Sequence, residues 1–270
     1  AAYGALSRPA LQVRAALLRD RAWARGWRGR VATAVANAAT RVARTADLVI
    51  VADEQVPPHT RERIVQRNLP DLSMLPEPGP RSGAPRALYV GDVRASRGLW
   101  SMIDAIAAVP QWQLDIVGPV AASDRERLAR ELECRGLAAR VHLLGRQPPR
   151  EAWRLARDAW CGLALLEDTP AFRDALPSKL YEYLASGLAV VVTDLPRQAV
   201  LATVSGAGEV VPAGPGAGAA AAAVLRSWSS RPDTIDARRS AARTWSAGLD
   251  NAPYAAVAAR VRELLCQHPR

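Results

Sequence analysis

The chain is poor in the residues that build metal sites, disulfide scaffolds and membrane spans. Its three cysteines and three histidines are scattered, and none of them forms the Cys-x-x-Cys or His-x-x-x-His spacing that holds zinc. No apolar run reaches the roughly 18 to 20 residues that cross a bilayer, and the first residues show no signal-peptide pattern. These absences disfavour a disulfide scaffold and a structural metal site, and they predict a cytoplasmic protein.

Lysine is almost absent, although the chain is strongly basic. One of the 36 basic residues is a lysine, Lys179, which leaves 35 arginines, and the 26 acidic residues bring the net charge to +10. Excess positive charge favours an anionic partner, such as a nucleotide, a nucleic acid or an acidic lipid surface. Abundant arginine and alanine together indicate the coding bias of a GC-rich genome, so arginine frequency carries little functional weight. The single lysine is therefore the more informative basic residue.

Positive charge is concentrated in the first 44 residues, where nine arginines and one aspartate give a net charge of 9 − 1 = +8. A helical period of about 100° per residue places four of these arginines on one face: Arg14, Arg21, Arg25 and Arg28. Tryptophans and valines fall roughly opposite. Two interpretations remain: a helix that packs its tryptophan face on a core, and a basic face in residues 8–44 that binds an anionic membrane surface. The tryptophans favour packing.

Beyond a proline- and glycine-rich linker at 76–85, strand-like and helix-like segments alternate regularly. Strands are expected at 87–91, 113–118, 141–144, 161–166 and 188–193, with helices between them. This alternation predicts an α/β fold, a Rossmann-like parallel sheet with helices on both faces. The expected organisation is an N-terminal region at 1–75, the linker, a main domain at 86–230 and C-terminal helices at 231–270.

The loop that follows the first strand of the main domain carries two candidate basic residues. The loop begins at Gly91 and lacks the GxGxxG fingerprint, which disfavours an NAD or FAD enzyme. It offers Arg94 and Arg97 where a helix begins, a placement suited to a diphosphate. The alternative is a pair of solvated loop arginines, and this turn alone does not decide between the two.

The most informative segment, DALPSKLYEYLASGLAVVVTD, begins at Asp174. Asp174 and Glu182 lie eight positions apart, one in a loop and one within the following helix, and they are expected to grip ligand hydroxyls. The backbone N–H groups of Ala175 and Leu176 lie near the positive end of that helix and are expected to face phosphate or sugar oxygens. Lys179 lies one helical turn before Glu182, on the same side.

This segment resembles the C-terminal, donor-binding domain of the glycosyltransferases of family 4, which have the two-domain GT-B architecture. The family carries a Glu-x7-Glu signature, and Asp174 and Glu182 match its spacing with the first acid changed to aspartate. The turn YVGDVRASRG at 89–98 resembles the family's VG(R)xxxxKG turn, with Asp92 in place of the usual arginine. The loop LGRQ at 144–147 resembles the one that meets the nucleotide base.

The resemblance implies a role for each candidate residue. Glu182 would bind the ribose hydroxyls and Asp174 those of the transferred sugar, while Arg97 and Lys179 would stabilise the diphosphate as negative charge grows on it. The implied catalytic set is Arg97, Lys179 and Asp174. The implied donor-binding set is Glu182, Gly91, Arg94, Arg146, Gln147, Ala175 and Leu176, in which Arg94 replaces the missing arginine.

The function implied by the resemblance is that of a retaining glycosyltransferase. It would move a sugar from a nucleotide-diphosphate donor to a glycan or lipid-linked acceptor in polysaccharide or cell-envelope synthesis. No metal or other cofactor is expected, because Asp-x-Asp occurs nowhere. The arginine-rich start includes no recognisable nucleic-acid-binding module, so no nucleic-acid partner is expected.

Residues 1–75 are too short to complete a second Rossmann domain, so the resemblance also implies a partial N-terminal domain and a chain that is poorly active by itself. The alternatives are a nucleotide-sugar epimerase of the same architecture and a non-catalytic nucleotide-binding fragment.

Overall fold

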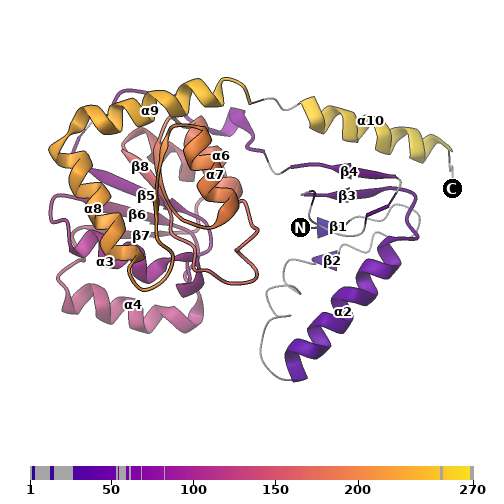
Figure 1. The fold of residues 1–270 in the computed structure, drawn as a ribbon, viewed down its shortest axis with the longest axis horizontal. Helices are drawn as coiled ribbons and strands as arrows, with labels where there is room; N and C mark the ends of the chain where they lie inside the picture. The colour runs from indigo at the N-terminus through magenta and orange to yellow at the C-terminus, as the bar shows by residue number, and fades with distance from the viewer. Residues whose placement is uncertain are drawn as a thin grey trace. The chain divides into compact units, whose positions relative to one another are not determined.

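The computed structural model describes residues 2–3, 13–14, 27–52, 54, 59–60, 62–67, 69–81, 83–249 and 252–267. The chain divides into two compact units (Figure 1). The first unit combines residues 1–69 with 250–270, and the second comprises residues 70–249. The predicted C-terminal segment 231–270 is therefore divided between the two units.

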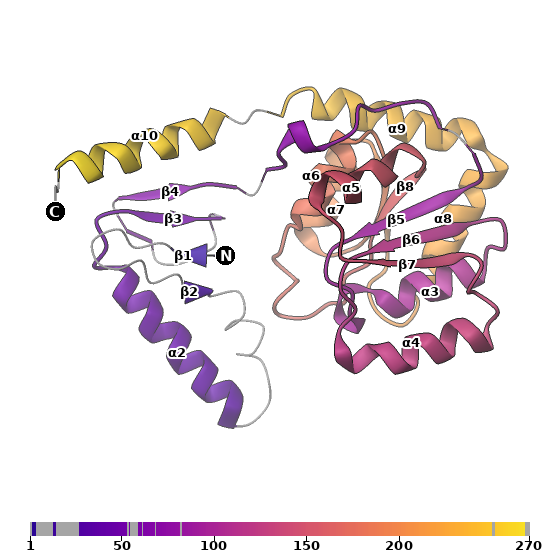
Figure 2. The ribbon, with the colours of Figure 1, turned by 180° about the vertical axis from the view of Figure 1, so that it is seen from behind.

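The second unit is built on a six-stranded sheet. Its strands are β5 (Arg86–Val90), β6 (Gln113–Val117), β7 (Val141–Gly145), β8 (Cys161–Ala164), β9 (Ala189–Thr193) and β10 (Gly208–Val211). All neighbouring strands are parallel, and their order is β10-β9-β8-β5-β6-β7. Strands β8, β5, β6 and β7 can be followed in Figure 2. Every residue of β8 and β9 is buried, as expected for strands of a sheet covered on both faces.

Helices cover both faces of this sheet (Figures 1 and 2). On one face, a buried cluster that includes Tyr89 joins α3 (Leu99–Ala107), α4 (Ala122–Cys134) and α8 (Ala217–Ser230). On the other, a cluster that includes Leu88 joins α5 (Pro149–Arg154), α6 (Ser178–Ala185), α7 (Pro196–Val204) and α9 (Pro232–Ser246). Successive strand residues point to opposite faces, which is why Leu88 and Tyr89 belong to different clusters. The predicted α/β fold with a parallel sheet is confirmed.

Three short 3₁₀ helices complete the unit: η1 (Leu72–Met74), η2 (Ala95–Arg97) and η3 (Leu155–Arg157). The sequence analysis did not foresee α7 and β10, which follow β9. β10 is an edge strand with a single buried residue, Val211, so it lacks the continuous apolar run that identifies the central strands.

The proline-rich stretch at 76–85 lies against α9 and does not run as a free linker. Arg239 of α9 donates from Nη2 to the carbonyl O of Gly79 at 2.9 Å. Arg81 forms two hydrogen bonds with the Asp236 carboxylate, each at 3.0 Å, and its guanidinium lies 4.2 Å from the ring centroid of Trp160.

The described residues of the first unit form two small sheets and two helices. β1 (Ala2–Tyr3) pairs antiparallel with β2 (Val13–Arg14), and β3 (Val49–Val51) pairs parallel with β4 (Arg63–Val65). The helices are α2 (Trp27–Ala43) and α10 (Ala252–Gln267). Within the described ranges, no helix combines the length and apolar character needed to span a membrane.

The predicted basic helical face is wrong in one respect. Arg14 lies in β2 and Arg28 in α2, so no single helix carries both residues. Arg21 and Arg25 lie outside the described residues. The two-residue pairing of β2 with β1 depends on a contact with another segment, which helical periodicity cannot reveal.

Candidate functional site

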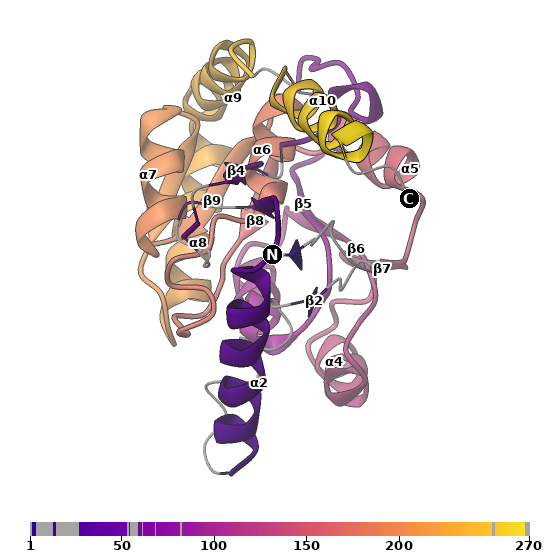
Figure 3. The ribbon, with the colours of Figure 1, turned by 90° about the vertical axis from the view of Figure 1, so that its right-hand side faces the viewer.

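The strand order changes direction between β5 and β8, which lie side by side in the sheet (Figure 3). The loops after these strands meet, because the amide of Glu167 donates to the carbonyl O of Ser96 at 3.1 Å. Gly98 approaches Leu165 so closely that a Cβ there would overlap the carbonyl O of Leu165. Ligands of parallel α/β sheets bind outside the carboxyl ends of the strands at such a switch point. The candidate site is therefore where these two loops meet.

Contacts with Gly118 and with Asp124 of α4 hold the loop after β5 in place. Gly118 has a φ of +143°, and a Cβ at this position would overlap the carbonyl O of Gly91, so only glycine fits. Asp124, in the first turn of α4, accepts a hydrogen bond from the amide of Ala95 through Oδ2 at 3.1 Å. These contacts fix the start of η2, the element that carries Arg97.

Two arginines of this loop have side-chain atoms without a partner. Arg94 donates from Nη2 to Oδ2 of Asp92 at 3.1 Å, and the Arg97 guanidinium lies 5.6 Å from the ring centroid of Phe172. The Nε atom of each arginine is buried and, within the described part of the chain, has no hydrogen-bond partner. An unsatisfied buried donor is costly in a folded protein. These atoms therefore mark a place suited to an acceptor.

Lys179, in the first turn of α6, is a buried basic residue. Its exposed fraction is 6%, and its Nζ has no hydrogen-bond partner among the residues that the structure describes. Burial, followed by repulsion from Arg97, holds the pKa of Lys179 well below its usual value, while Glu182 and Asp92 act in the opposite direction. A buried ammonium without a partner destabilises the empty site. An anionic ligand that accepts a hydrogen bond from Nζ would remove this penalty.

Glu182 lies one turn after Lys179 on α6. Burial raises the pKa of its carboxyl, and the charge of Lys179 opposes this shift. A spacing of three residues on one helix places the two side chains on neighbouring positions of the same face, as the sequence predicts.

Asp174 and its neighbours lie in the exposed part of the loop before α6. The Asp174 side chain is exposed, and its main-chain O accepts a hydrogen bond from Nη1 of Arg197 at 3.1 Å. The amide of Ala175 donates to the carbonyl O of Phe172 at 2.9 Å. That N–H is used within the loop, so its predicted approach to a ligand is not met in this structure. Leu176 is partly buried and packs against the apolar cluster under α6.

Arg146 and Gln147 follow β7, the edge strand, and are separated from β5 by β6. Both side chains are exposed, and Gln147 donates from Nε2 to the carbonyl O of Leu144 at 2.8 Å. At about 4.8 Å per strand, β7 lies about 10 Å from β5 across the sheet. The role of Arg146 and Gln147 stays a prediction.

Two tyrosines that the sequence analysis did not single out build the floor of the site. Tyr183 accepts a hydrogen bond from the amide of Val90 at 3.1 Å and so ties α6 to β5. A Cβ at Gly162 would overlap the Tyr183 ring, so this glycine makes room for it in β8. Tyr89 lies under Nζ of Lys179, with 3.6 Å between Nζ and the ring centroid. No local signal identifies either residue, because both contacts join distant segments.

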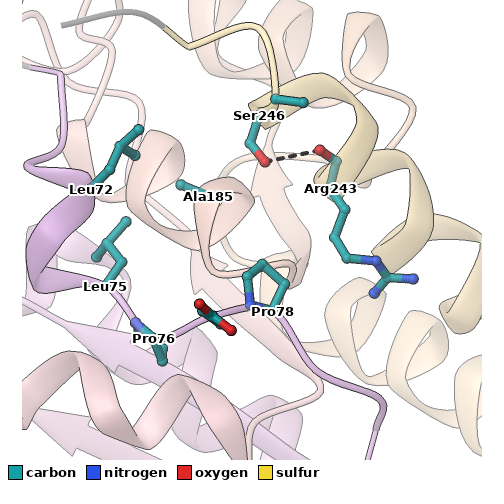
Figure 4. Close-up of a pocket in the computed structure, with 9 residues that line it drawn as sticks. Leu72, Leu75, Pro76, Pro78, Ala185, Arg243 and Ser246 are labelled. Atoms are coloured by element: carbon teal, nitrogen blue, oxygen red, sulfur yellow. Dashed lines mark hydrogen bonds between the residues drawn. The ribbon is translucent and has the colours of Figure 1, made fainter.

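A cavity of about 340 Å³ lies elsewhere in the second unit (Figure 4). It is lined by Leu72, Leu75, Pro76, Glu77, Pro78, Ala185, Arg243, Ser246 and Ala247. Ala185 is the last residue of α6, whereas Lys179 lies in its first turn. None of the predicted site residues lines this cavity, which is therefore separate from the candidate site.

Comparisons with known proteins identify the family and the fold. Residues 74–245 match the sequence family described as glycosyl transferases group 1. No curated protein matches the chain. Within the described residues, no group of three or more His, Cys, Asp or Glu side chains is arranged to hold a metal ion, and the metal-free mechanism stays a prediction.

Three solved structures illustrate the shared fold. Sucrose-phosphate synthase from Thermosynechococcus elongatus is 18% identical to this chain with a TM-score of 0.72, and the match covers 94% of this chain and 66% of the synthase. HepE from Anabaena, solved in complex with UDP, is 15% identical with a TM-score of 0.64, and the match covers 89% of this chain and 76% of HepE. WaaG, a glycosyltransferase involved in lipopolysaccharide biosynthesis, is 24% identical with a TM-score of 0.53, and the match covers 64% of this chain and 45% of WaaG. The chain thus spans less than two thirds of two of these three structures.

Proposed function

The chain belongs to the glycosyl transferases group 1 family, and from this premise we propose that it binds a nucleotide-diphosphate sugar at the switch point and transfers the sugar with retention of configuration. The proposed acceptor is a glycan or a lipid-linked glycan. The observation that carries the proposal is Lys179, a buried ammonium without a hydrogen-bond partner among the described residues, at the carboxyl end of β5.

Positive charge around this ammonium fits a diphosphate. Lys179, Arg97 and Arg94 each have a buried nitrogen without a hydrogen-bond partner in the described structure. When the bond to the sugar breaks, negative charge develops on the leaving diphosphate, and fixed positive charges in a site with little water stabilise that charge. Lys179 and Arg97 are proposed for this role, and Arg94 is proposed to replace the arginine that Asp92 displaces.

The two carboxylates are proposed to bind hydroxyl groups. Glu182, on the same helix as Lys179, is assigned to the ribose of the nucleotide, and Asp174, on the exposed loop, is assigned to the transferred sugar. Arg146 and Gln147 are assigned to the loop beside the base. HepE, which shares the fold, was solved in complex with UDP, so UDP is the first ligand to test.

Calorimetry with UDP, GDP and ADP tests the donor site, with the corresponding monophosphates as controls. We expect at least one diphosphate to bind and its monophosphate to bind more weakly, because the second phosphate supplies the charge for Lys179 and Arg97. If no diphosphate binds, or if mono- and diphosphate bind equally, the proposed site is wrong. Incubation of the matching nucleotide sugars with glycan acceptors, followed by NMR of the product anomer, separates a retaining transferase from an epimerase.

We further propose that α2 binds an anionic membrane surface. Val31, Val35 and Val42 are exposed by 52%, 46% and 54%, and the helical period places them within one narrow stripe. Arg30 and Arg41, both exposed, lie to one side of this stripe. An apolar stripe flanked by arginines is the pattern of a helix that lies in the lipid interface.

Sedimentation with vesicles of neutral or anionic phospholipid tests this surface. We expect binding to anionic vesicles that weakens with salt, at about 1 kcal/mol per basic residue near the membrane. Arg30→Gln with Arg41→Gln should reduce the binding, and Arg130→Gln with Arg226→Gln, at exposed positions of α4 and α8 in the second unit, is the charge-matched control. Equal sedimentation with both vesicle types would leave α2 with a structural role only.

A further inference from the structure

The ammonium of Lys179 rests on an aromatic ring. Its Nζ lies 3.6 Å from the ring centroid of Tyr89, and Tyr89 is fully buried. The face of an aromatic ring is negative, so it attracts a cation placed above it, and the attraction is larger when both partners are out of water. The ring is therefore a protein group that stabilises the charged form of Lys179 without occupying its hydrogen-bond donors.

The hydroxyl of Tyr89 makes a separate contact with the loop after β5. It donates to the carbonyl O of Asp92 at 2.7 Å. Burial raises the pKa of Tyr89 to about 12, against the effect of the nearby Arg97 charge, so the hydroxyl remains a donor at neutral pH. This hydrogen bond fixes the turn immediately before Arg94.

Lysine and ring approach each other across the end of the sheet. α6 packs on one face of the sheet, whereas Tyr89 belongs to the cluster on the other face. Lys179 reaches the ring over Gly91, where a Cβ would lie 3.1 Å from Nζ. The missing side chain at Gly91 therefore leaves space for the contact.

We propose that Tyr89 is a positioning residue for the diphosphate site, whose ring holds the ammonium of Lys179 in place and whose hydroxyl holds the turn that carries Arg94 and Arg97. The proposal rests on the proposed function, because it assigns the three cationic side chains to one ligand. The ring accepts no conventional hydrogen bond from the ammonium, so Nζ remains a donor for phosphate oxygens.

Other groups around Lys179 also affect how readily it holds its proton. Burial and the charge of Arg97, from η2, disfavour the ammonium, while Glu182 on α6 and Asp92 in the turn favour it. Tyr183, also on α6, is buried, and burial raises its pKa well above the usual value, so it stays neutral. A weaker ring face would leave the disfavouring groups unchanged, so Lys179 would lose its proton at lower pH.

The single lysine allows a direct test without ligand. Labelling lysine with ¹³C and ¹⁵N gives one lysine side-chain signal, whose titration midpoint reports Lys179 alone. We compare wild type, Tyr89→Phe and a chain with trifluorophenylalanine at position 89, which keeps the ring size and weakens its negative face. Tyr89→Phe should keep the wild-type midpoint, and the fluorinated ring should lower it by about half a pH unit or more. Equal midpoints in all three folded proteins would overturn the role of the ring.

Calorimetry with UDP tests the hydroxyl. Tyr89→Phe should weaken UDP binding about 2- to 12-fold, the effect of one lost neutral hydrogen bond, without moving the Lys179 midpoint. Tyr254→Phe, in α10 of the first unit, is the matched control and should leave UDP affinity unchanged. Unchanged affinity in Tyr89→Phe would overturn the role of the hydroxyl.

The two measurements separate this inference from the proposed function. If wild type binds no nucleoside diphosphate while the Lys179 midpoint responds to the ring, the proposed function fails and the contact between ring and ammonium stands. If UDP binds wild type and neither measurement responds to Tyr89, the site stands and the positioning role is wrong.

Discussion

Two buried cations of the second unit, Arg239 in α9 and Lys179 in α6, have opposite surroundings. Arg239 is 2% exposed and donates to three main-chain carbonyls, those of Ala159, Trp160 and Gly79, at 2.7, 3.3 and 2.9 Å. Lys179 is 6% exposed, and its Nζ has no hydrogen-bond partner within the described chain. Burial lowers the pKa of both groups.

This difference distinguishes a cation that stabilises the fold from a cation that binds a ligand. Arg239 joins Gly79, in the stretch 76–81, to the residues just before β8, and its donors are used in doing so. Lys179 faces the carboxyl end of β5, and its donors are left for a molecule outside the chain. Burial of a charge destabilises the protein in either case, unless hydrogen-bond partners compensate for it. For Arg239 these partners belong to the fold, whereas for Lys179 they would belong to a ligand.

The largest effect is expected for Arg239→Met. Removing the guanidinium leaves buried carbonyls without their donor, and we expect the free energy of unfolding to fall by about 3 kcal/mol, with UDP affinity of the folded protein unchanged. Urea denaturation and calorimetry measure the two quantities. Arg238→Met is the matched control on the same helix, where a half-exposed ion pair with Glu209 should contribute about 1 kcal/mol or less. If Arg239→Met lost UDP affinity and kept its stability, the proposed difference between Arg239 and Lys179 would be wrong.

Lys179→Met should show the opposite pattern. Losing a charged partner should weaken binding of UDP by about 1.5 to 3 kcal/mol, roughly 10- to 150-fold. The free energy of unfolding should stay equal or rise, because an unpaired buried charge is replaced by an apolar chain of similar length. The same two measurements apply, and a variant that unfolds as easily as Arg239→Met would show that Lys179 supports the fold.

Variants of Glu182 and Asp174 test which part of the donor each carboxylate binds. Glu182→Gln should weaken both UDP and UDP-glucose by about 1.5 to 3 kcal/mol, because the ribose is present in each ligand. Asp174→Asn should weaken only UDP-glucose or another nucleotide sugar, since its proposed partner is the transferred sugar. Calorimetry with both ligands checks this, and two folded variants with wild-type affinities would place the donor elsewhere.

The smallest effect is a pH dependence of stability. The pKa of Lys179 is lower in the folded chain than its usual 10.5, so between the two values the unfolded chain binds more protons and stability rises with pH. Below the folded pKa, the penalty for burying the charge is fully present and constant. The unfolding free energy of wild type minus that of Lys179→Met should therefore increase toward pH 10.5, by at most about 1.4 kcal/mol per pH unit, so a stability advantage of the variant shrinks as pH rises. A difference that is flat with pH would mean an unshifted lysine.

Much of the fold was predictable because its signals are local. The apolar runs of β5, β6 and β9 are short and bounded by turn residues, and helices follow them at regular spacing. The segment that begins at Asp174 was identified by residue types and spacing alone. Where the signal was weak, at the half-exposed edge strand β10, the prediction missed the element.

By itself, the sequence determined the α/β alternation, the family resemblance and the identity of Lys179 as the single lysine, since each depends on neighbouring residues or on composition. The tertiary structure alone decided that β5 lies beside β8, that Arg14 lies in a strand, and that Lys179 rests on Tyr89. These facts depend on which distant segments pair, and pairing is set by the packing of whole faces against each other. The periodicity of a single segment carries no record of its partner.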